Sequence, residues 1–213
     1  MTLKFNEEFA INPQSVESGG GGGTKYLISN VTKVGTLVDN KGVLSSFEGG
    51  NTPKYAQSSI PSIGNNTWEF IVDFTTGNSL IQQETIGIST RGASPFYMWS
   101  DGGLRLFLSN NGTSWDIYNP ATSYIILSAN TNYKFKCTFD GSKYTVSRYA
   151  NNGWTVLETV TSSTPINSNN KLWIGINQRI STPGAPFLGS INLNECSLKI
   201  GSETVWTGMT TQN

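Results

Sequence analysis

Apolar and polar residues alternate with a period of two along several stretches of this chain. In WEFIVDF (68–74), the aromatic residues and one valine share one phase, while Glu69 and Asp73 share the other. The same alternation recurs in LRLFL (104–108), YKFKCTF (133–139) and LWIGI (172–176). A period of two is typical of a β-strand with one buried face, whereas an amphipathic helix needs a 3.6-residue period over about 11 residues or more. No stretch has that helical period, so the sequence predicts an all-β protein.

Two Asn-Gly pairs, Asn111-Gly112 and Asn152-Gly153, lie between runs rich in aromatic and β-branched residues. Asn and Gly tolerate the positive φ of a tight turn, so each pair predicts an antiparallel hairpin. Consecutive hairpins with alternating faces favour antiparallel sheets packed on one another. We therefore expect a two-sheet sandwich.

Length and charge narrow the class further. The chain has 213 residues, no His, and 14 basic against 14 acidic residues, for a formal net charge of zero. The length suits one large β domain, and the balanced charge argues against nucleic acid as a partner. No apolar run reaches the ~18–20 residues of a membrane span. The N-terminal MTLKFNEEFA is acidic where a secretory signal would be apolar, so neither membrane insertion nor a signal peptide is expected.

A run of five glycines, Gly19–Gly23, divides the N-terminal end from the rest. We predict that residues 1–23 form an arm and Gly-rich loop, with or without a part in the first strands, and that residues 24–213 form the sandwich. The glycines are interpreted either as a flexible surface loop or as the joint of an arm that docks on a partner subunit.

The apolar phase changes once within FLGSINLNECSLKIGSETVW (187–206). Ile191 and Leu193 share one phase, and Cys196, Leu198 and Ile200 share the opposite one. A regular strand would turn the second set toward water, so we predict a β-bulge or similar irregularity near Asn194-Glu195.

Both cysteines lie in apolar phases, Cys137 with Phe135 and Phe139, and Cys196 with Leu198. They are interpreted as small buried hydrophobes. A disulfide would need Cβ atoms within about 4.5 Å, and reduced cysteines are favoured. A zinc site is excluded because there is no His and no closely spaced Cys pair.

Few residues suit catalysis. Without His, triads and bases built on His are excluded. Glu69 and Asp73 would lie ~13 Å apart along a strand, too far for the acid pair of a glycosidase. We therefore expect no enzymatic activity and no cofactor. A structural calcium ion stays an open alternative without assigned ligands, since Ca²⁺ accepts dispersed oxygen atoms.

Several aromatic residues fall out of the core phase or near turns, with polar neighbours. Such rings stack on pyranoses while amides and carboxylates bind the hydroxyls. Trp173 is a further aromatic residue outside the core phase. For each of these rings, packing between the sheets or against a sister subunit is the alternative interpretation. The candidate glycan-binding residues are Arg91, Tyr97, Trp99, Asp101, Trp115, Asp116, Tyr118, Asn177 and Arg179.

The segment KLWIGINQRISTPGAPFLGSINLNECSLKIGSETVW (171–206) resembles the C-terminal signature of concanavalin A-like, laminin G-type jelly rolls. The matching positions are Phe187, Gly189, Ile191, Leu193, Glu195, Leu198, Ile200, Gly201 and Trp206. TWEFIVDFTTG (67–77) resembles an early strand of that family, and residues 131–157 resemble its central strand and hairpin. The resemblance implies an antiparallel jelly-roll sandwich of the concanavalin A-like lectin/glucanase type.

The sequence of the C-terminal segment is most similar to that of domains in bacteriophage tail, fibre and head-fibre proteins. That resemblance implies a virion protein made in the host cytoplasm, with other virion proteins, further copies of itself and host cell-surface glycans as partners. The E-x-D-x-x-E run of the family's glucanases is absent, which removes that activity from what the resemblance implies. The alternatives are a purely structural protein whose aromatics form subunit contacts, and a glycoside hydrolase.

Overall fold

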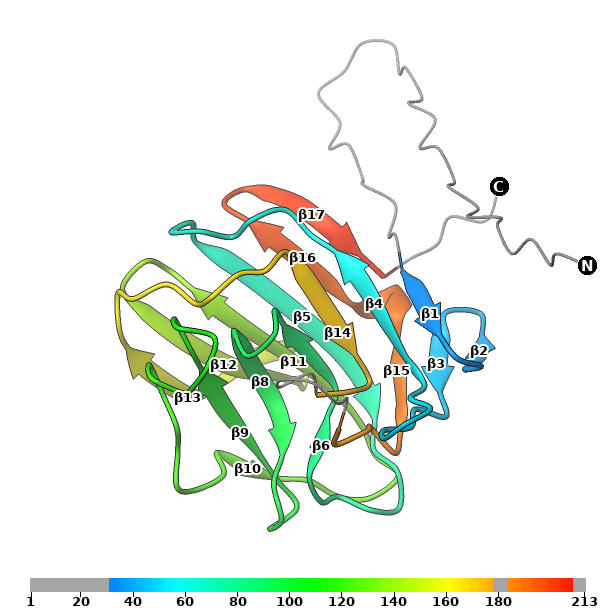
Figure 1. Ribbon diagram of the computed structural model, residues 1–213. Helices are drawn as coiled ribbons and strands as arrows, with labels where there is room; N and C mark the ends of the chain where they lie inside the picture. Colours follow the sequence, from blue (N-terminus) through cyan, green and yellow to red (C-terminus); the bar gives the residue numbers. More distant parts are fainter. Residues whose placement is uncertain (1–30, 178–183, 209–213) are drawn as a thin grey trace, which may run out of the picture.

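The computed structural model describes residues 31–177 and 184–208, which form two antiparallel sheets packed face to face (Figure 1). In sheet A the strand order is β1-β4-β14-β7-β8-β9-β10, with β6 also beside β8. The bounds are β1 Thr32–Val34, β4 Tyr55–Ser59, β6 Gln83–Glu84, β7 Ile86–Ile88, β8 Ala93–Met98, β9 Gly103–Leu108, β10 Ile125–Ile126 and β14 Lys171–Ile174. The predicted all-β two-sheet sandwich is confirmed.

Sheet B has the order β13-β12-β11-β5-β15-β3-β2, and β16 pairs with both β5 and β17. Its bounds are β2 Val38–Asn40, β3 Val43–Ser45, β5 Trp68–Thr75, β11 Asn132–Phe139, β12 Lys143–Ala150, β13 Gly153–Thr161, β15 Ser190–Asn192, β16 Ser197–Ile200 and β17 Glu203–Thr207. The proposed arm, residues 1–23, lies outside the described residues.

One apolar core fills the space between the sheets. From β5 it receives the phase predicted for WEFIVDF, with Phe70, Val72 and Phe74 fully buried. The ring of Phe74 stacks on Phe135 of the neighbouring β11, with centroids 5.8 Å apart. Sheet A supplies the opposite wall, including Leu106 of β9. Alternation along each strand therefore decides which residues lie inside and which form the outer faces.

The two Asn-Gly pairs behave differently. Residues Asn151 and Asn152 have φ of 51° and 61° and join β12 to β13, with Ala150 paired to Gly153. Positive φ at both central residues defines a type I′ turn, so the hairpin is confirmed, although the turn is Asn151-Asn152. Around Asn111-Gly112 the predicted antiparallel pairing is confirmed, since β9 pairs antiparallel with β10 and Leu108 forms a bridge with Tyr118. The tight turn predicted there is wrong, because a longer loop joins the two strands.

The change of phase near the C-terminus is confirmed as an interruption of the strand. A single 3₁₀ turn, Leu193–Glu195, separates β15 from β16. It keeps Ile191, Cys196 and Leu198 all at 2% exposure or less. The irregularity is thus a helical turn in place of the expected bulge.

Both cysteines are free and buried, as predicted. Burial raises the pKa of the Cys137 thiol well above its ordinary range. Burial likewise raises the pKa of Cys196 to about 12. Both side chains therefore stay as neutral thiols in the folded protein.

Candidate functional site

Three aromatic side chains of sheet A are buried without belonging to the core. Tyr97, Phe107 and Trp173 expose 3%, 3% and 9% of their surface, yet none is part of the apolar cluster between the sheets. Each alternates with core residues, as Phe107 does with Leu106 and Leu108, and therefore lies on the outer face of the sheet. The outer face of sheet A thus carries aromatic surface where a sandwich usually presents polar residues to water.

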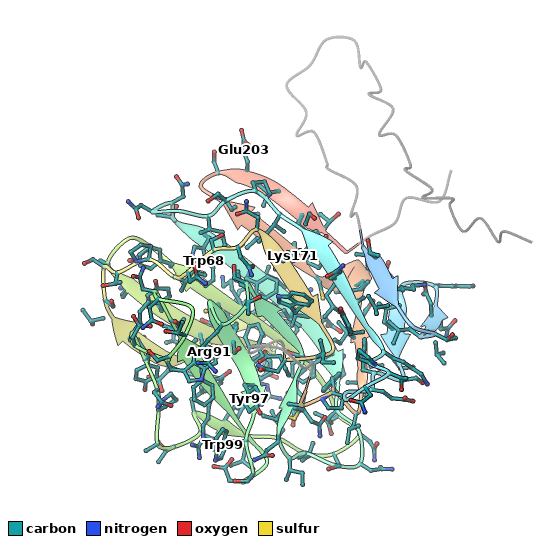
Figure 2. The ribbon with its side chains drawn as sticks, viewed as in Figure 1. Trp68, Arg91, Tyr97, Trp99, Lys171 and Glu203 are labelled. Atoms are coloured by element: carbon teal, nitrogen blue, oxygen red, sulfur yellow. The ribbon has the colours of Figure 1, made fainter. Side chains whose placement is uncertain are left out.

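Four rings form a continuous row on this face over β8, β9 and the loop after β9. Phe107 lies 5.7 Å from Tyr97, 5.8 Å from Trp99 and 5.3 Å from Trp115, measured between ring centroids. We call these four residues the aromatic row. Tyr97 and Phe107 form its nearly buried floor, whereas Trp99 and Trp115 are half-buried and reach solvent on either side of Phe107. Figure 2 shows Arg91, Tyr97 and Trp99 in succession along this part of the sheet.

A cation lies over each tryptophan of the outer face. The guanidinium carbon of Arg105 is 4.7 Å from the ring centroid of Trp99, and that of Arg91 is 5.7 Å from Trp115. A third pair forms on β14, where Lys171 Nζ is 5.4 Å from Trp173. These distances are typical of cation–π contacts.

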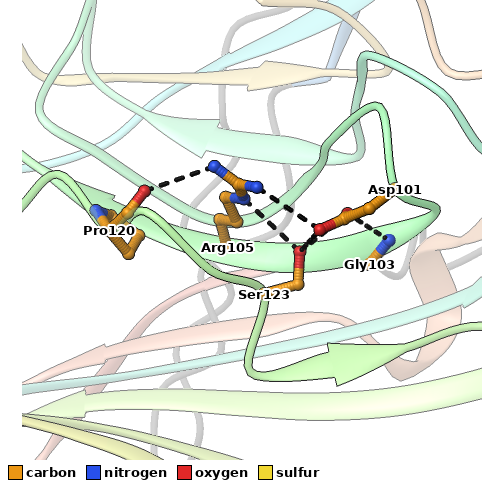
Figure 3. Close-up of polar contacts among 5 residues, drawn as sticks. All are labelled: Asp101, Gly103, Arg105, Pro120 and Ser123. Carbon is orange, nitrogen blue, oxygen red and sulfur yellow. Dashed lines mark hydrogen bonds and ion pairs between the residues drawn. The ribbon is translucent and has the colours of Figure 1, made fainter.

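Arg105 is held in place by a polar network (Figure 3). Its Nη2 lies 3.3 Å from Asp101 Oδ2, and its Nη1 donates to the carbonyl oxygen of Pro120 at 3.3 Å. Asp101 also accepts from the backbone N–H of Gly103 at 3.0 Å and from the Ser123 hydroxyl at 2.8 Å. Desolvation alone would raise the pKa of Asp101, but these hydrogen bonds lower it below the ordinary value. The carboxylate is therefore ionised at neutral pH and neutralises Arg105.

Trp115 projects from a loop that Asp116 organises. The loop begins after Leu108, which forms an isolated bridge with Tyr118. The Asp116 carboxylate accepts hydrogen bonds from Ser109 Oγ at 2.9 Å and from the backbone N–H of Asn110 at 3.1 Å. A short acidic side chain that binds nearby backbone N–H groups competes with strand pairing. This explains why the expected tight hairpin is replaced by a longer loop.

Three connections meet at one end of sheet A. The backbone N–H of Ser89, in the β7–β8 turn, donates to the Lys171 carbonyl at 2.7 Å. The side chain of Asn169 donates to Thr90 Oγ1 at 2.7 Å. The N–H of Asn167 donates to the carbonyl of Ser109, at the start of the Trp115 loop, at 2.7 Å. The segment 165–171 therefore anchors both the turn that carries Arg91 and the loop that carries Trp115.

The turn that carries Arg91 is conformationally strained. Ser89 and Arg91 have φ of 61° and 54°, a region that side chains other than Gly enter at a cost of about 1–3 kcal/mol. The Arg91 Nε is buried and has no hydrogen-bond partner within the described part of the chain. Strain of this kind persists only where surrounding contacts impose it, and here the segment 165–171 supplies those contacts.

A buried acidic group lies between Trp173 and Tyr97 on the same face. Glu84 has no exposed surface, and its Oε2 accepts a hydrogen bond from Asn177 Nδ2 at 2.8 Å. Its carboxyl carbon lies 3.8 Å from the position that a Cβ would take at Gly87, which is paired with Trp173. The glycine therefore leaves room for a carboxylate at the centre of the outer face.

The predicted residues fall into three groups. Arg91, Tyr97, Trp99 and Trp115 come together on the outer face, with Asp101 and Asp116 bound at its margins. Tyr118 packs against the core, and Asn177 binds Glu84. Arg179 lies outside the described residues.

Sequence reasoning missed Phe107, Arg105 and Glu84. The signal for the first two was present in LRLFL, because three leucines in the core phase leave the arginine and phenylalanine facing outward. Glu84 gave no such signal, since its place depends on the pairing of β6 with β8.

Residues 31–177 and 184–208 contain no group of three or more Cys, Asp or Glu side chains positioned to hold a metal ion. Within those ranges there is also no helix with the length and hydropathy of a membrane span.

Comparison with known proteins shows the fold. No protein-family model and no curated protein sequence matches this chain. Among solved structures, a Trypanosoma rangeli sialidase in complex with 2,3-difluorosialic acid is similar at a TM-score of 0.54 and 10% identity. The same sialidase with 2,3-difluoro-KDN matches at 0.54 and 12%. A heptameric SAP-like pentraxin from Limulus polyphemus has a TM-score of 0.45 and 20% identity, and the match covers 80% of this chain and 81% of the pentraxin.

The sialidase matches cover most of this chain but a minor part of the sialidase chain. Each match includes 84% of this chain but only 28% of the sialidase chain. At 10–12% identity the likeness shows a shared β-sandwich fold. Function has to be argued from the outer face of sheet A itself.

Proposed function

We propose that this protein binds glycans through the outer face of sheet A and works by adhesion, without catalysis. The observation that carries the proposal is the aromatic row, in which Trp99 and Trp115 rise half-buried on either side of Phe107. Flat aromatic faces stack on the apolar face of a pyranose, and fixed polar groups at the margin bind its hydroxyls. Asp101 and the Trp115 loop supply such groups.

The fixed geometry of the site favours this function. Trp99 is held between Arg105 and the floor residues Tyr97 and Phe107, so its ring loses little freedom when a ligand binds. A small open surface of this kind binds a single sugar at ~mM, which corresponds to about −4 kcal/mol. Display of many copies on one particle would raise the avidity by about 10²–10⁴-fold.

Placement on a bacteriophage particle is the finer part of the proposal. It rests on the resemblance of residues 171–206 to phage fibre and head-fibre domains, and it makes other virion proteins, further copies of this chain and host-surface glycans the partners. A structural subunit-contact protein is the second candidate, because the same half-buried tryptophans suit a protein interface. Light scattering that finds a stable oligomer with Trp99 and Trp115 protected, and no sugar binding, would favour it.

Multivalent binding to a glycan array tests the proposal. We expect binding by a clustered form of the full chain, weak binding by the monomer, and loss of the signal in Trp99→Ala. Trp154→Ala is the matched control, because Trp154 is also half-buried and lies 4.6 Å from a cation, Lys136, but belongs to sheet B. An equal loss in both variants, or sub-micromolar binding by the monomer, would contradict the mechanism. Release of reducing sugar from cell-wall polysaccharide would instead indicate a hydrolase.

A further inference from the structure

Two cations on the outer face of sheet A have no acidic partner among the residues that the structure describes. The ion pairs among the described residues include Arg105 with Asp101, but neither Arg91 nor Lys171 takes part in one. Both side chains are half-buried, and each lies over a tryptophan. Their charges are therefore held near the surface without internal compensation.

Of the three acids on this face, Asp116 alone keeps an exposed charge without a cationic partner among the described residues. Asp101 neutralises Arg105, and the Asp116 carboxylate accepts hydrogen bonds from its own loop. Glu84 is completely buried and bound to Asn177. The exposed Asp116 carboxylate keeps its charge, because its hydrogen bonds come from neutral groups. Two unpaired cations, Arg91 and Lys171, stand against it, so the charge that a ligand can reach on the described part of this face sums to positive, even though the whole chain has a formal net charge of zero.

The two cations are presented by one rigid unit. The Lys171 carbonyl accepts a hydrogen bond from the N–H of Ser89, two residues before Arg91. Thr90, which lies between Ser89 and Arg91, accepts hydrogen bonds from the side chains of Asn167 and Asn169. The strained φ of Arg91 fixes the direction in which its side chain leaves the turn. Positions fixed in this way lose little entropy on binding, which favours a specific ligand over a diffuse counter-ion cloud.

We propose that the glycan bound by this face is acidic, and that Arg91 and Lys171 bind its carboxylate, sulfate or phosphate groups while the half-buried indole of Trp115 stacks on one of its rings. This inference rests on the proposed function and adds the ligand class to it. Arginine binds a carboxylate or a phosphate through two parallel hydrogen bonds, which gives direction as well as charge. The partner is therefore a polyanionic saccharide, with neutral glycans bound less tightly.

The test uses the full chain, clustered on beads, against an array that includes oligogalacturonate, its methyl ester, and sulfated and phosphorylated oligosaccharides. Oligogalacturonate and its ester differ in charge on the same sugar backbone. We expect at least one acidic class to be bound about tenfold more tightly than its neutral counterpart. We also expect binding to weaken as salt rises from about 50 to 300 mM, since exposed charges are screened.

Three variants locate the effect. Arg91→Gln and Lys171→Gln should each reduce binding to the acidic class about fivefold or more, whereas Arg91→Lys, which keeps the charge, should recover part of the binding. Arg148→Gln is the matched control, because Arg148 also lies over a ring, that of Tyr133, but belongs to sheet B. Thermal unfolding of each variant shows whether it is folded.

The outcomes separate the two proposals. Equal binding of charged and neutral members overturns the acidic class and leaves glycan binding intact. If the preference for acidic members is lost in Arg148→Gln but kept in Arg91→Gln and Lys171→Gln, the proposed binding of the anionic groups on the outer face of sheet A is overturned. The absence of binding to every member of the array overturns glycan binding itself, and the acidic class with it.

Discussion

The guanidinium of Arg91 lies over the indole of Trp115, with its central carbon 5.7 Å from the ring centroid. The two residues come from different connections, the β7–β8 turn and the loop after β9. Both connections are hydrogen-bonded to the segment 165–171. This pair therefore forms only when three parts of the chain that are distant in sequence have folded together.

The first prediction concerns Trp115 and stability. Trp115→Ala should abolish detectable glycan binding while changing the midpoint of thermal unfolding little, because Trp115 is half-buried and outside the core cluster. The control is Trp206→Ala, since Trp206 is 2% exposed and belongs to the core. It should destabilise the fold by about 3–5 kcal/mol. Circular dichroism measures the unfolding midpoints, and the glycan array measures binding. A large loss of stability in Trp115→Ala would show that the ring is structural.

A second prediction tests the packing of the Arg91 turn. A Cβ at Gly92 would lie 2.2 Å from the carbonyl oxygen of Asn167 and 2.7 Å from that of Ile88, both backbone atoms. Gly92→Ala must therefore displace the turn, and we expect a loss of about 1–3 kcal/mol together with weaker glycan binding. At Gly153 a Cβ meets nothing within 4 Å, so Gly153→Ala should change neither. Wild-type stability and binding in Gly92→Ala would contradict the anchoring of this turn by the segment 165–171.

Much of the fold could be predicted because alternation is a local property. The burial of Phe70, Val72 and Phe74 follows from the sequence of β5 alone, and the reversal of phase after Leu193 required an interruption. The form of that interruption, a 3₁₀ turn, was not predictable. It depends on tertiary contacts such as the hydrogen bond from the N–H of Leu193 to the carbonyl of Gly42.

The candidate site was less predictable because its parts meet through pairing that the sequence does not encode locally. Aromatic residues in non-core phases identified Tyr97, Trp99 and Trp115. Asn111-Gly112 does not form a tight turn because the carboxylate of Asp116, five residues after the asparagine, binds the backbone of a longer loop. The chain pairs with β9 again only at Tyr118 and in β10. Lys171 is not among the predicted residues, although Leu172 and Ile174 in the core phase turn its side chain outward. Its place beside the β7–β8 turn depends on strand pairing that the sequence does not show.

A third prediction concerns the thiols. Burial raises the pKa of both cysteines, to about 12 for Cys196, and keeps reagents away from them. At pH 8 the native protein should react with a chromogenic disulfide reagent far more slowly than a free thiol does, because the thiolate is the reacting species. After denaturation in guanidinium without reductant, two thiols per chain should react at once. Rapid reaction of the native protein would contradict the burial, and no reaction after denaturation would indicate a disulfide.

The last prediction concerns Asp73, on the outer face of sheet B. The residue is 7% exposed, and its carboxylate accepts a hydrogen bond from Asn132 Nδ2 at 3.0 Å. Desolvation raises its pKa above the ordinary 3.8, while the Asn132 bond and the charge of Lys134 lower it and that of Glu195 raises it. Below pH 3.8 the group is protonated in both states. As pH rises through the folded pKa, the unfolded state releases its proton more readily, so the stability contributed by the protonated form is lost.

Asp73→Asn lacks this titration and can still accept the Asn132 hydrogen bond. The midpoint of thermal unfolding of Asp73→Asn, relative to wild type, should therefore rise between pH 4 and pH 7. Asp140→Asn is the control of opposite sign, because hydrogen bonds from the Ser142 side chain and backbone lower the pKa of Asp140. Its relative midpoint should fall as pH rises toward the ordinary pKa of 3.8, because wild type gains stability from the ionised form in that acid range, and it should level off at higher pH. Parallel midpoint curves for wild type and Asp73→Asn would show that Asp73 is as well solvated in the folded chain as in the unfolded one.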